Sequence, residues 1–278
     1  MIWKKSPMVK FASWTVVVLL LAFALFPLYW MVATSLKTSE QATQIPSALL
    51  PITPTIEGYV DGWTSRPFGR YFFNTAAIAI GTTIVATAFA LFASYGFSRF
   101  RLTVGPLLLT VLLIFQMFPS SLLIVPYFML MRQVNLINTH WALILAYTSF
   151  SLPICIWMLK AFFDNIPKSI EEAGLIDGGT RWQVLIHIVL PMSLPGIGAA
   201  VIYIFIHAWK EYIFALTLAT NRDMYVISVG IAAFIGEHTT DWNEMMAMSV
   251  ISVIPVIVLF VFLQRHLVSG LTAGAVKG

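Results

Sequence analysis

The sequence predicts an all-α integral membrane protein with six transmembrane helices and both termini in the cytoplasm. Three observations support this fold class. Hydrophobic residues make up 59% of the 278 residues and charged residues only 10%, and both fractions depart from the averages of soluble domains. The apolar residues fall in long blocks. Lys and Arg are divided unequally between the segments that separate these blocks.

Each of the six apolar blocks is long enough to cross a membrane, which requires a helix of about 20 residues. A helix also satisfies its own backbone hydrogen bonds in lipid. In chain order, the predicted spans cover residues 11–33, 72–97, 104–130, 141–163, 194–218 and 245–263. Prolines within these spans predict kinks, because proline removes a backbone donor; they are Pro27, Pro119, Pro126, Pro153 and Pro255.

The first span follows Lys4, Lys5 and Lys10, as the apolar part of a signal peptide would. Its apolar run continues to Ala33 and is too long for a signal peptide, so an uncleaved anchor is the favoured interpretation. The single cysteine, Cys155, lies in the fourth span and is expected to be a buried packing residue.

Orientation follows from the basic residues, which are retained on the cytoplasmic side. With the N-terminus inside, Lys37, Arg66, Arg70, Arg132 and Arg222 face outward, and Lys210 lies within the fifth span. The cytoplasmic segments hold twice as many basic residues as the outer ones: Lys4, Lys5, Lys10, Arg99, Arg101, Lys160, Lys168, Arg181, Arg265 and Lys277. The net charge of +4 is ordinary for such loops and indicates no nucleic-acid partner.

The loop of residues 164–193 differs from the other connections, because its polar and apolar residues alternate at helical spacing. Pro167, early acids and Gly178 predict a helix from Pro167 to Asp177, with Gly178 as a left-handed stop. Thr180 and Gln183 predict a capping box that starts a second helix, which Pro191 is expected to end. The second helix should bear an apolar stripe at Trp182, Leu185, Ile186 and Val189.

The first helix of this loop carries Ala173 and Gly174 beside Ile170, which leaves a face with little side-chain bulk. Such a face would let another protein approach closely. An amphipathic hairpin that lies on the membrane, or on the chain's own helices, explains the same pattern equally well.

Two runs in this loop are more specific, Glu171-Glu172-Ala173-Gly174-Leu175-Ile176-Asp177-Gly178-Gly179 and Ile188-Val189-Leu190-Pro191. Together they resemble the EAA loop of binding-protein-dependent ABC importer permeases. The ending Gly270-Leu271-Thr272-Ala273-Gly274-Ala275-Val276-Lys277-Gly278 resembles carbohydrate-uptake permeases of the maltose-transporter type. Gly174 and Gly179 stand where this family usually has alanine, which should reduce the stiffness of the loop.

The resemblance implies the type I ABC importer permease fold in a bacterial or archaeal inner membrane. Its implied partners are a second permease subunit, two cytoplasmic ATPase subunits that bind ATP and Mg, an extracytoplasmic solute-binding protein and membrane lipid. This chain would bind no cofactor. The implied ATPase-coupling residues are Glu171, Glu172, Ala173, Gly174, Asp177, Gly178, Ile188, Leu190 and Pro191.

The expected organisation is an N-terminal helix and outer segment over 1–70, an importer core over 71–264 with the coupling loop 164–193, and a cytoplasmic tail over 265–278. Trp209-Lys210-Glu211 departs from the family's usual Trp-Asn-acid pattern only at its centre. Ionised groups inside a membrane often mark solute paths, so Glu211 is a candidate translocation residue. A snorkelling Glu211 is the alternative.

Other functions are less well supported. The chain lacks the G-x-x-x-x-G-K-[ST] loop of an ATPase, and its five histidines are scattered. A membrane enzyme would need paired acids or a metal motif, and a secondary transporter should show repeated helix groups. The sequence therefore favours a sugar or oligosaccharide importer subunit. A polyol or glycerol-phosphate derivative as cargo, or a secondary transporter, remains the alternative.

Overall fold

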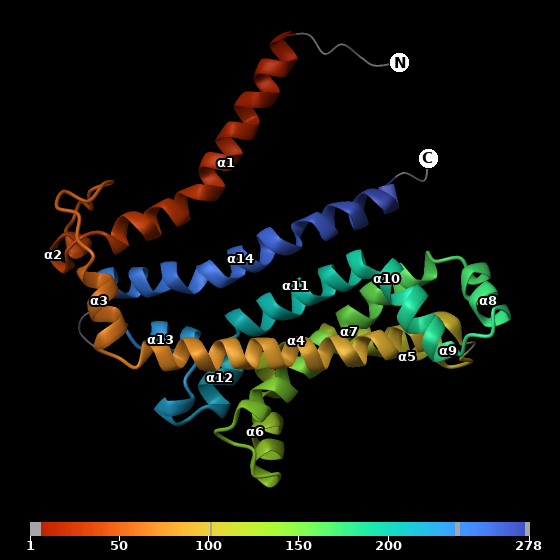
Figure 1. Cartoon of the computed structure of the whole chain (residues 1–278). Helices are drawn as coiled ribbons and strands as arrows, with labels where there is room; N and C mark the ends of the chain where they lie inside the picture. Colours follow the sequence, from red (N-terminus) through yellow and green to blue (C-terminus); the bar gives the residue numbers. More distant parts are fainter. Residues whose placement is uncertain (1–6, 101, 237–239, 276–278) are drawn as a thin grey trace. The chain divides into compact units, whose positions relative to one another are not determined.

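The computed structural model describes the backbone of residues 7–100, 102–236 and 240–275, and side chains as far as residue 264. Lys4, Lys5 and Arg101, together with the side chains of the expected tail 265–278, lie outside this description. The chain divides into two compact units, Met1–Phe68 with Ile231–Val253, and Gly69–Gly230 with Ile254–Gly278. Figure 1 shows the course of the chain through its helices.

The first unit contains α1 (Pro7–Ser35), α2 (Ser39–Thr43), α3 (Glu57–Thr64) and the beginning of α14 (Trp242–Ala275). The α1 helix is apolar and exposed on nearly all sides, as expected of a span that faces lipid or another subunit. Just beyond it, Lys37 is fully buried, with its ammonium over the Trp30 ring. That ammonium donates hydrogen bonds to Ser47 Oγ (3.1 Å) and to the Ala48 carbonyl (2.6 Å), which holds the following segment against the end of α1.

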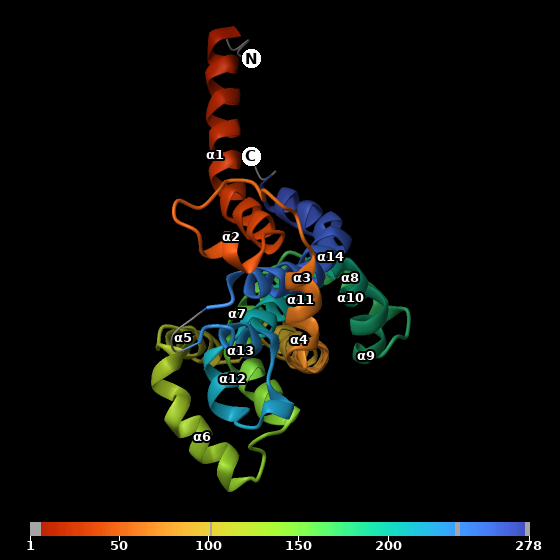
Figure 2. The same cartoon turned by 90° about the vertical axis from the view of Figure 1, so that its left-hand side faces the viewer.

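The second unit is built from the long helices α4 (Phe68–Arg99), α7 (His140–Asp164) and α11 (Leu194–Lys210). The α7 helix packs against α11 and against α5 (Gly105–Gln116). Shorter helices complete the unit: α6 (Ile124–Gln133), α8 (Lys168–Ile176), α9 (Arg181–Val184), α10 (Leu190–Met192), α12 (Ile213–Leu218) and α13 (Ile227–Ala232). The α12 helix contacts both α6 and α7, and Figure 2 shows it beside α6.

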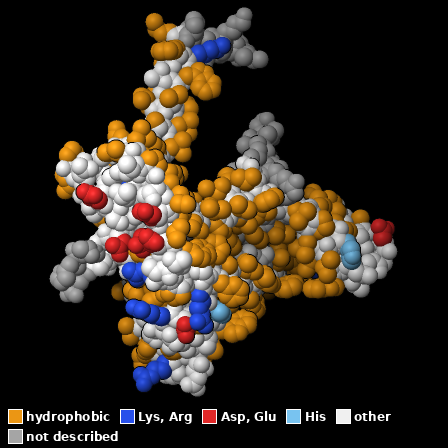
Figure 3. Space-filling view, turned by 60° about the vertical axis from the view of Figure 1, so that its left-hand side comes forward, with side chains coloured by type: hydrophobic (Ala, Val, Ile, Leu, Met, Phe, Trp, Pro, Cys, Tyr) orange, Lys and Arg blue, Asp and Glu red, His pale blue; other side chains and the backbone are white. Residues whose placement is uncertain are grey.

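Hydrophobic side chains cover much of the helical surface, with charged side chains gathered in separate areas (Figure 3). Within the described residues, four helices are long and apolar enough to span a membrane, and two bent helix pairs raise the total to six if each pair is one span. The four single helices match the first, second, fourth and sixth predicted spans, and one bent pair matches the third. The other pair joins Arg181–Met192 to Leu194–Lys210 and therefore differs from the predicted fifth span, residues 194–218. The exposed apolar surface matches lipid and subunit contacts rather than water.

The predicted third span, residues 104–130, is wrong as a continuous helix. The chain leaves the α5 helix at Gln116 and bends by 94° before the helical stretch Ser120–Gln133. Pro119, at the turn, has φ −57° and ψ 123°. Proline disfavours a helical conformation in the residue before it and cannot donate a backbone hydrogen bond. Both properties favour a break here, but Pro27, Pro153 and Pro255 lie inside helices, so proline by itself does not decide where a helix breaks.

The predicted fifth span, residues 194–218, is also interrupted. The α11 helix ends at Lys210, and Glu211 adopts an extended conformation with ψ 135° before α12 begins. The Glu211 carboxylate accepts hydrogen bonds from the amides of Phe214 (3.0 Å) and Ala215 (3.2 Å). These bonds satisfy amides at the start of α12, so the Glu211 carboxylate is held against the beginning of that helix.

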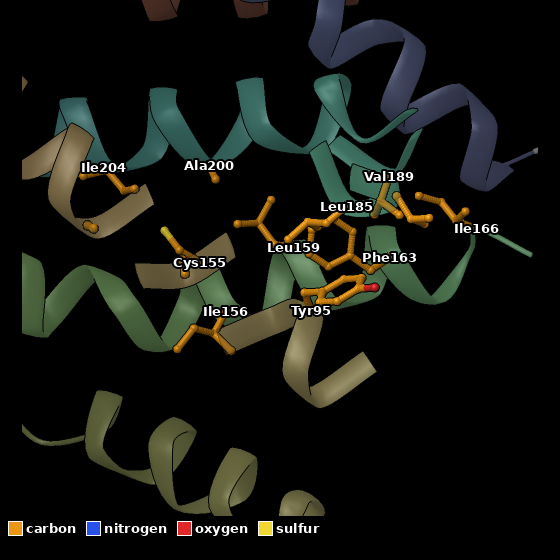
Figure 4. Close-up of a cluster of buried hydrophobic side chains, with 13 residues drawn as sticks. Tyr95, Cys155, Ile156, Leu159, Phe163, Ile166, Leu185, Val189, Ala200 and Ile204 are labelled. Carbon is orange, nitrogen blue, oxygen red and sulfur yellow. The ribbon is translucent and has the colours of Figure 1, made fainter. Parts of the chain in front are cut away.

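A single buried apolar cluster joins α4, α7, α11 and the loop before α11 (Figure 4). Phe163 and Leu159 of α7 are fully buried in it, as is Val189 of the loop. Cys155 is also fully buried there, as its position in the fourth span predicts. The cluster fixes the base of the loop to the long helices.

Candidate functional site: the 164–193 hairpin

The loop between α7 and α11 is a helical hairpin, which Figure 1 shows at one end of α7 and α11. Its first helix, α8, runs from Lys168 to Ile176 with Pro167 as N-cap and Asp177 as C-cap. Gly178 has a φ of +87°, the left-handed conformation that glycine adopts without strain. The predicted helix and its glycine stop are therefore confirmed to within one residue at each end.

The second arm of the hairpin begins with the predicted capping box. The Gln183 amide donates to Thr180 Oγ1 (3.3 Å), and the Thr180 amide donates to Gln183 Oε1 (2.8 Å). These reciprocal bonds satisfy two amides that a helix start leaves free. Val184, Leu185 and Val189 are buried on this arm.

Pro191 does not end the second arm, contrary to the prediction from the sequence. Helical structure continues through Met192, and the bend of 77° to α11 comes at Ser193. The five residues Leu185–Val189 form a π-helical turn, in which the Leu190 amide donates to the Leu185 carbonyl. The π-helical turn shifts the backbone hydrogen bonds by one residue just before Pro191. The helix therefore accommodates a proline, which has no backbone amide hydrogen, at this position.

Glu171 anchors the hairpin to the end of α4. Its carboxylate forms an ion pair with Arg99, in which the two side chains are 6% and 9% exposed, and it accepts a hydrogen bond from the Tyr95 hydroxyl (3.0 Å). Arg99 also donates to the Ile166 carbonyl (3.2 Å) at the end of the preceding connection. A buried charge is tolerated only when paired in this way. Glu171 is therefore a buried anchor and is not open to another protein.

The small residues Ala173 and Gly174 do not form one shared outer face. A Cβ added to Gly174 would lie 2.8 Å from Ile188 Cδ1 and 3.1 Å from Val184 Cγ2. Gly174 thus lets the two arms of the hairpin pack closely against each other. Its carbonyl also accepts the Gly179 amide (3.0 Å), while Ala173 faces outward and is exposed.

The outer surface of the hairpin is formed by the tip. Glu172, Ala173, Asp177 and Gly178 are exposed, and Ile176 is 85% exposed. The remaining residues of the predicted set divide between surface and interior: Pro191 is exposed, and Ile188 and Leu190 are half-buried. We name the five exposed residues of the tip the docking tip.

Three residues of this site escaped the sequence analysis. Ile176 is an apolar residue beside Asp177 near the end of the predicted first helix, a position visible in the sequence. Arg99 and Tyr95 lie more than 70 positions from Glu171, and no local pattern connects such distant residues. Only the packing of α4 against the hairpin reveals them.

Comparison with protein families gives a match over residues 86–273 to the model described as binding-protein-dependent transport system inner membrane component. The chain belongs to this family. The matched region contains α7, the hairpin and α11, so the permease carries the hairpin within the part that defines the family.

The permease is similar to named relatives over nearly its whole length. It is 38% identical to the sulfoquinovosyl glycerol transport system permease protein SmoH of Agrobacterium fabrum, over 94% of this chain and 91% of the relative. It is 35% identical to the trehalose/maltose transport system permease protein MalG of Thermococcus litoralis, over 94% of each. It is a multi-pass inner membrane transport component.

A solved structure supports the fold. One chain of a bacterial ABC transporter involved in the import of the acidic polysaccharide alginate superposes with a TM-score of 0.81, covering 96% of the permease and 99% of that chain at 18% sequence identity. At this identity the likeness concerns the fold alone. The broken third and fifth spans therefore lie within an ABC importer permease fold.

Glu211, the candidate translocation residue, lies far along the chain from the hairpin. It sits at the break between α11 and α12, where its backbone carbonyl accepts a hydrogen bond from Ser228 Oγ (2.6 Å). Its carboxylate lines a cavity whose other walls include Tyr147 and His207. The permease thus has two separate sites, the hairpin and this cavity.

Proposed function

We propose that the permease couples ATP hydrolysis by two partner ATPase subunits to the import of a sugar or oligosaccharide. The exposed docking tip would sit in clefts of the ATPase subunits on the cytoplasmic side, with both chain termini on that side. A second permease subunit and an extracytoplasmic solute-binding protein would complete the complex. ATP and Mg would be bound by the ATPase subunits, and this chain would make and break no covalent bond.

The observation that carries this proposal is the combination of an exposed tip and a buried base in one hairpin. Ile176 and Ala173 offer an apolar surface, and Asp177 and Glu172 add charges that a partner can recognise. The base is held by the Arg99–Glu171 ion pair and by the apolar cluster. Movement of the tip would therefore be transmitted to α4, α7 and α11, because close-packed interiors transmit displacement.

The sugar cargo is supported by the relatives, since the names of SmoH and MalG specify transport of a sulfoquinovosyl glycerol and of trehalose or maltose. The cargo of this permease would be of the same broad class. A polyol or a glycerol-phosphate derivative is the alternative cargo, and the same transport assay separates it from sugars.

The test is reconstitution of the complete complex in lipid vesicles, with ATP hydrolysis and uptake measured for a panel of sugars, polyols and glycerol phosphates. We expect a sugar with its binding protein to stimulate hydrolysis and to accumulate. Stimulation by polyols alone would overturn the sugar assignment. Uptake without the ATPase subunits would indicate a secondary transporter.

Coupling is tested by Asp177→Arg in the docking tip, which reverses a charge at the proposed contact. We expect ATP hydrolysis to lose its dependence on the sugar and uptake to fall at least tenfold, in complexes that still assemble. Glu57→Arg is a matched control, because Glu57 is exposed on α3 and the charge change is the same. Normal uptake by the Asp177→Arg complex would contradict the coupling role.

A further inference from the structure

A cavity of about 290 Å³ lies in the second unit, where α7 and α11 meet the breaks in the two interrupted spans. Its walls combine four aromatic rings with four polar side chains: Gln116, Phe118, Ser120, Tyr147, Phe150, His207, Glu211 and Phe214. The cavity exists because the chain leaves the helical path at Pro119 and at Glu211.

Two buried polar groups in the cavity wall lack ordinary hydrogen bonds. The side chain of Tyr147 is 1% exposed, and its hydroxyl makes no hydrogen bond of normal length, although the Glu211 carboxylate is near enough to interact with it. His207 Nδ1 is likewise buried without a partner. Buried polar groups are costly unless they are satisfied, so both groups are suited to a polar ligand that enters the cavity.

The other polar groups leave acceptors available. Gln116 uses its Nε2 to donate to the Phe150 carbonyl (3.2 Å), which leaves its side-chain oxygen free to accept. The Glu211 carboxylate already accepts two backbone amides, yet each carboxylate oxygen can accept a further bond. No Lys or Arg lines this cavity among the described residues, so its only formal charge is negative.

The aromatic rings determine which ligand shape fits. Phe150 and Phe214 lie 5.0 Å apart between ring centroids with planes tilted by 49°, and Tyr127 packs on both from behind. Phe150 and Phe214 are thus apolar parts of a cavity wall that also contains hydrogen-bonding groups. A hydroxylated ring has this combination of an apolar face and a polar rim. The cavity lies at the small end of ligand sites, which favours one ring over an oligosaccharide.

We propose that this cavity is a solute-contact site within this chain, which accepts one uncharged, hydroxylated sugar ring and disfavours an anionic one through the Glu211 carboxylate. Tyr147 and His207 would donate to or accept from ring hydroxyls, and Phe150 and Phe214 would pack on the apolar face of the ring. The inference rests on the proposed sugar import, because it assigns part of the solute path to this subunit. The Glu211 carboxylate would repel an anionic sugar, and such repulsion contributes to specificity by weakening the binding of the wrong solute.

The charge selectivity can be tested without knowing the cargo. In the assembled complex, Cys155→Ala removes the single native cysteine, and Ser120→Cys places a thiol in the exposed part of the cavity wall. Because a thiolate anion reacts faster with a cationic than with an anionic methanethiosulfonate at any site, we expect the cationic-to-anionic rate ratio at this thiol to be about tenfold above the ratio at a reference thiol. Adding Glu211→Gln should reduce the ratio to near that of the reference thiol at Thr220→Cys, an exposed position outside the cavity.

Solute contact is tested by protection and by uptake. Methyl glucoside, a neutral ring, should slow labelling at Ser120→Cys, whereas glucuronate, its acidic counterpart, should protect only after Glu211→Gln. In transport, Tyr147→Phe removes the hydroxyl but keeps the ring. It should raise the KM for the imported sugar severalfold and lower the maximal rate of uptake less than it raises the KM.

The outcomes separate this inference from the proposed function. If the wild-type complex imports a sugar but the cavity variants show neither charge-selective labelling nor a changed KM, the solute-contact site is refuted and the import function stands. If no sugar is imported, the proposed function fails, and labelling and protection still decide whether the cavity accepts neutral rings. Protection by a simple cation instead of a neutral ring would overturn the inference.

Discussion

Loss of the Glu171 carboxylate should loosen the hairpin from α4. The Glu171→Leu substitution leaves the Arg99 guanidinium buried with only its bonds to Ser98 Oγ (2.9 Å) and the Ile166 carbonyl (3.2 Å). It also removes the acceptor of the Tyr95 hydroxyl. Removing one partner of a buried ion pair costs about 3–5 kcal/mol. A cost of ~3 kcal/mol corresponds to a more than hundredfold change in the opening equilibrium.

The assay is hydrogen exchange of the α8 amides, Lys168–Ile176, in the assembled complex, combined with the number of solute molecules imported per ATP hydrolysed. We expect α8 exchange to accelerate by about a hundredfold or more, because local opening controls the exchange rate, and transport per ATP to fall. Glu172→Gln is the matched control for exchange, because it also removes one negative charge, at the residue next to Glu171, and Glu172 is exposed.

A double variant separates the ion pair from simple loss of packing. Arg99→Met in addition to Glu171→Leu removes both charges and restores an apolar contact, so slow exchange should be recovered in part. Unchanged exchange in Glu171→Leu would show that the apolar cluster alone holds the hairpin. If the double variant opened α8 by as much as the two single substitutions added together, the proposed role of the Arg99–Glu171 ion pair as an anchor would also be refuted.

Four glycine positions give three further tests, each read from thermal unfolding of the detergent-solubilised complex. Gly174→Leu should destabilise the hairpin by about 1–3 kcal/mol through overpacking between its arms. Gly174→Ala should cost less, because it needs only a small side-chain shift and gains helix propensity. Equal losses of stability in the two variants would contradict this packing. Gly178→Ala should cost about 1 kcal/mol of stability, because Gly178 has a φ of +87°. Gly178→Pro should in addition uncouple ATP hydrolysis from uptake. Full coupling in the Gly178→Pro complex would argue against a role for this turn. Gly196→Ala drives a methyl group into the Phe162 ring and should cost more than 1 kcal/mol of stability. The control Gly96→Ala adds a methyl group with no atom within 4 Å and should be neutral or stabilising. A larger loss of stability in Gly96→Ala than in Gly196→Ala would contradict the packing of α11 on α7.

Much of this permease could be read from sequence because the relevant signals are local. A membrane span depends on the summed hydropathy of about 20 consecutive residues, and four of the six predicted spans are single long helices in the structure. The capping box at Thr180 and the left-handed glycine at Gly178 depend only on neighbouring residues. The two arms of the hairpin were predicted for the same reason.

The breaks in two spans were not predicted, although Pro119 and Glu211 are visible in the sequence. Proline occurs inside three unbroken helices of this chain, so its presence alone does not distinguish a kink from a break. Glu211 breaks its helix because its carboxylate finds the amides of α12. Whether such alternative bonds outweigh a continued helix depends on the surrounding packing.

The sequence by itself determined the membrane class, the approximate spans and a helical hairpin with a family-specific motif. The tertiary structure decided which side of that hairpin is available. Glu171 and Glu172 are adjacent and chemically alike, yet one is buried against Arg99 of α4 and the other is exposed. Adjacent residues on a helix point about 100° apart, so their roles depend on which face meets a distant helix, and contacts across more than 70 positions decide that.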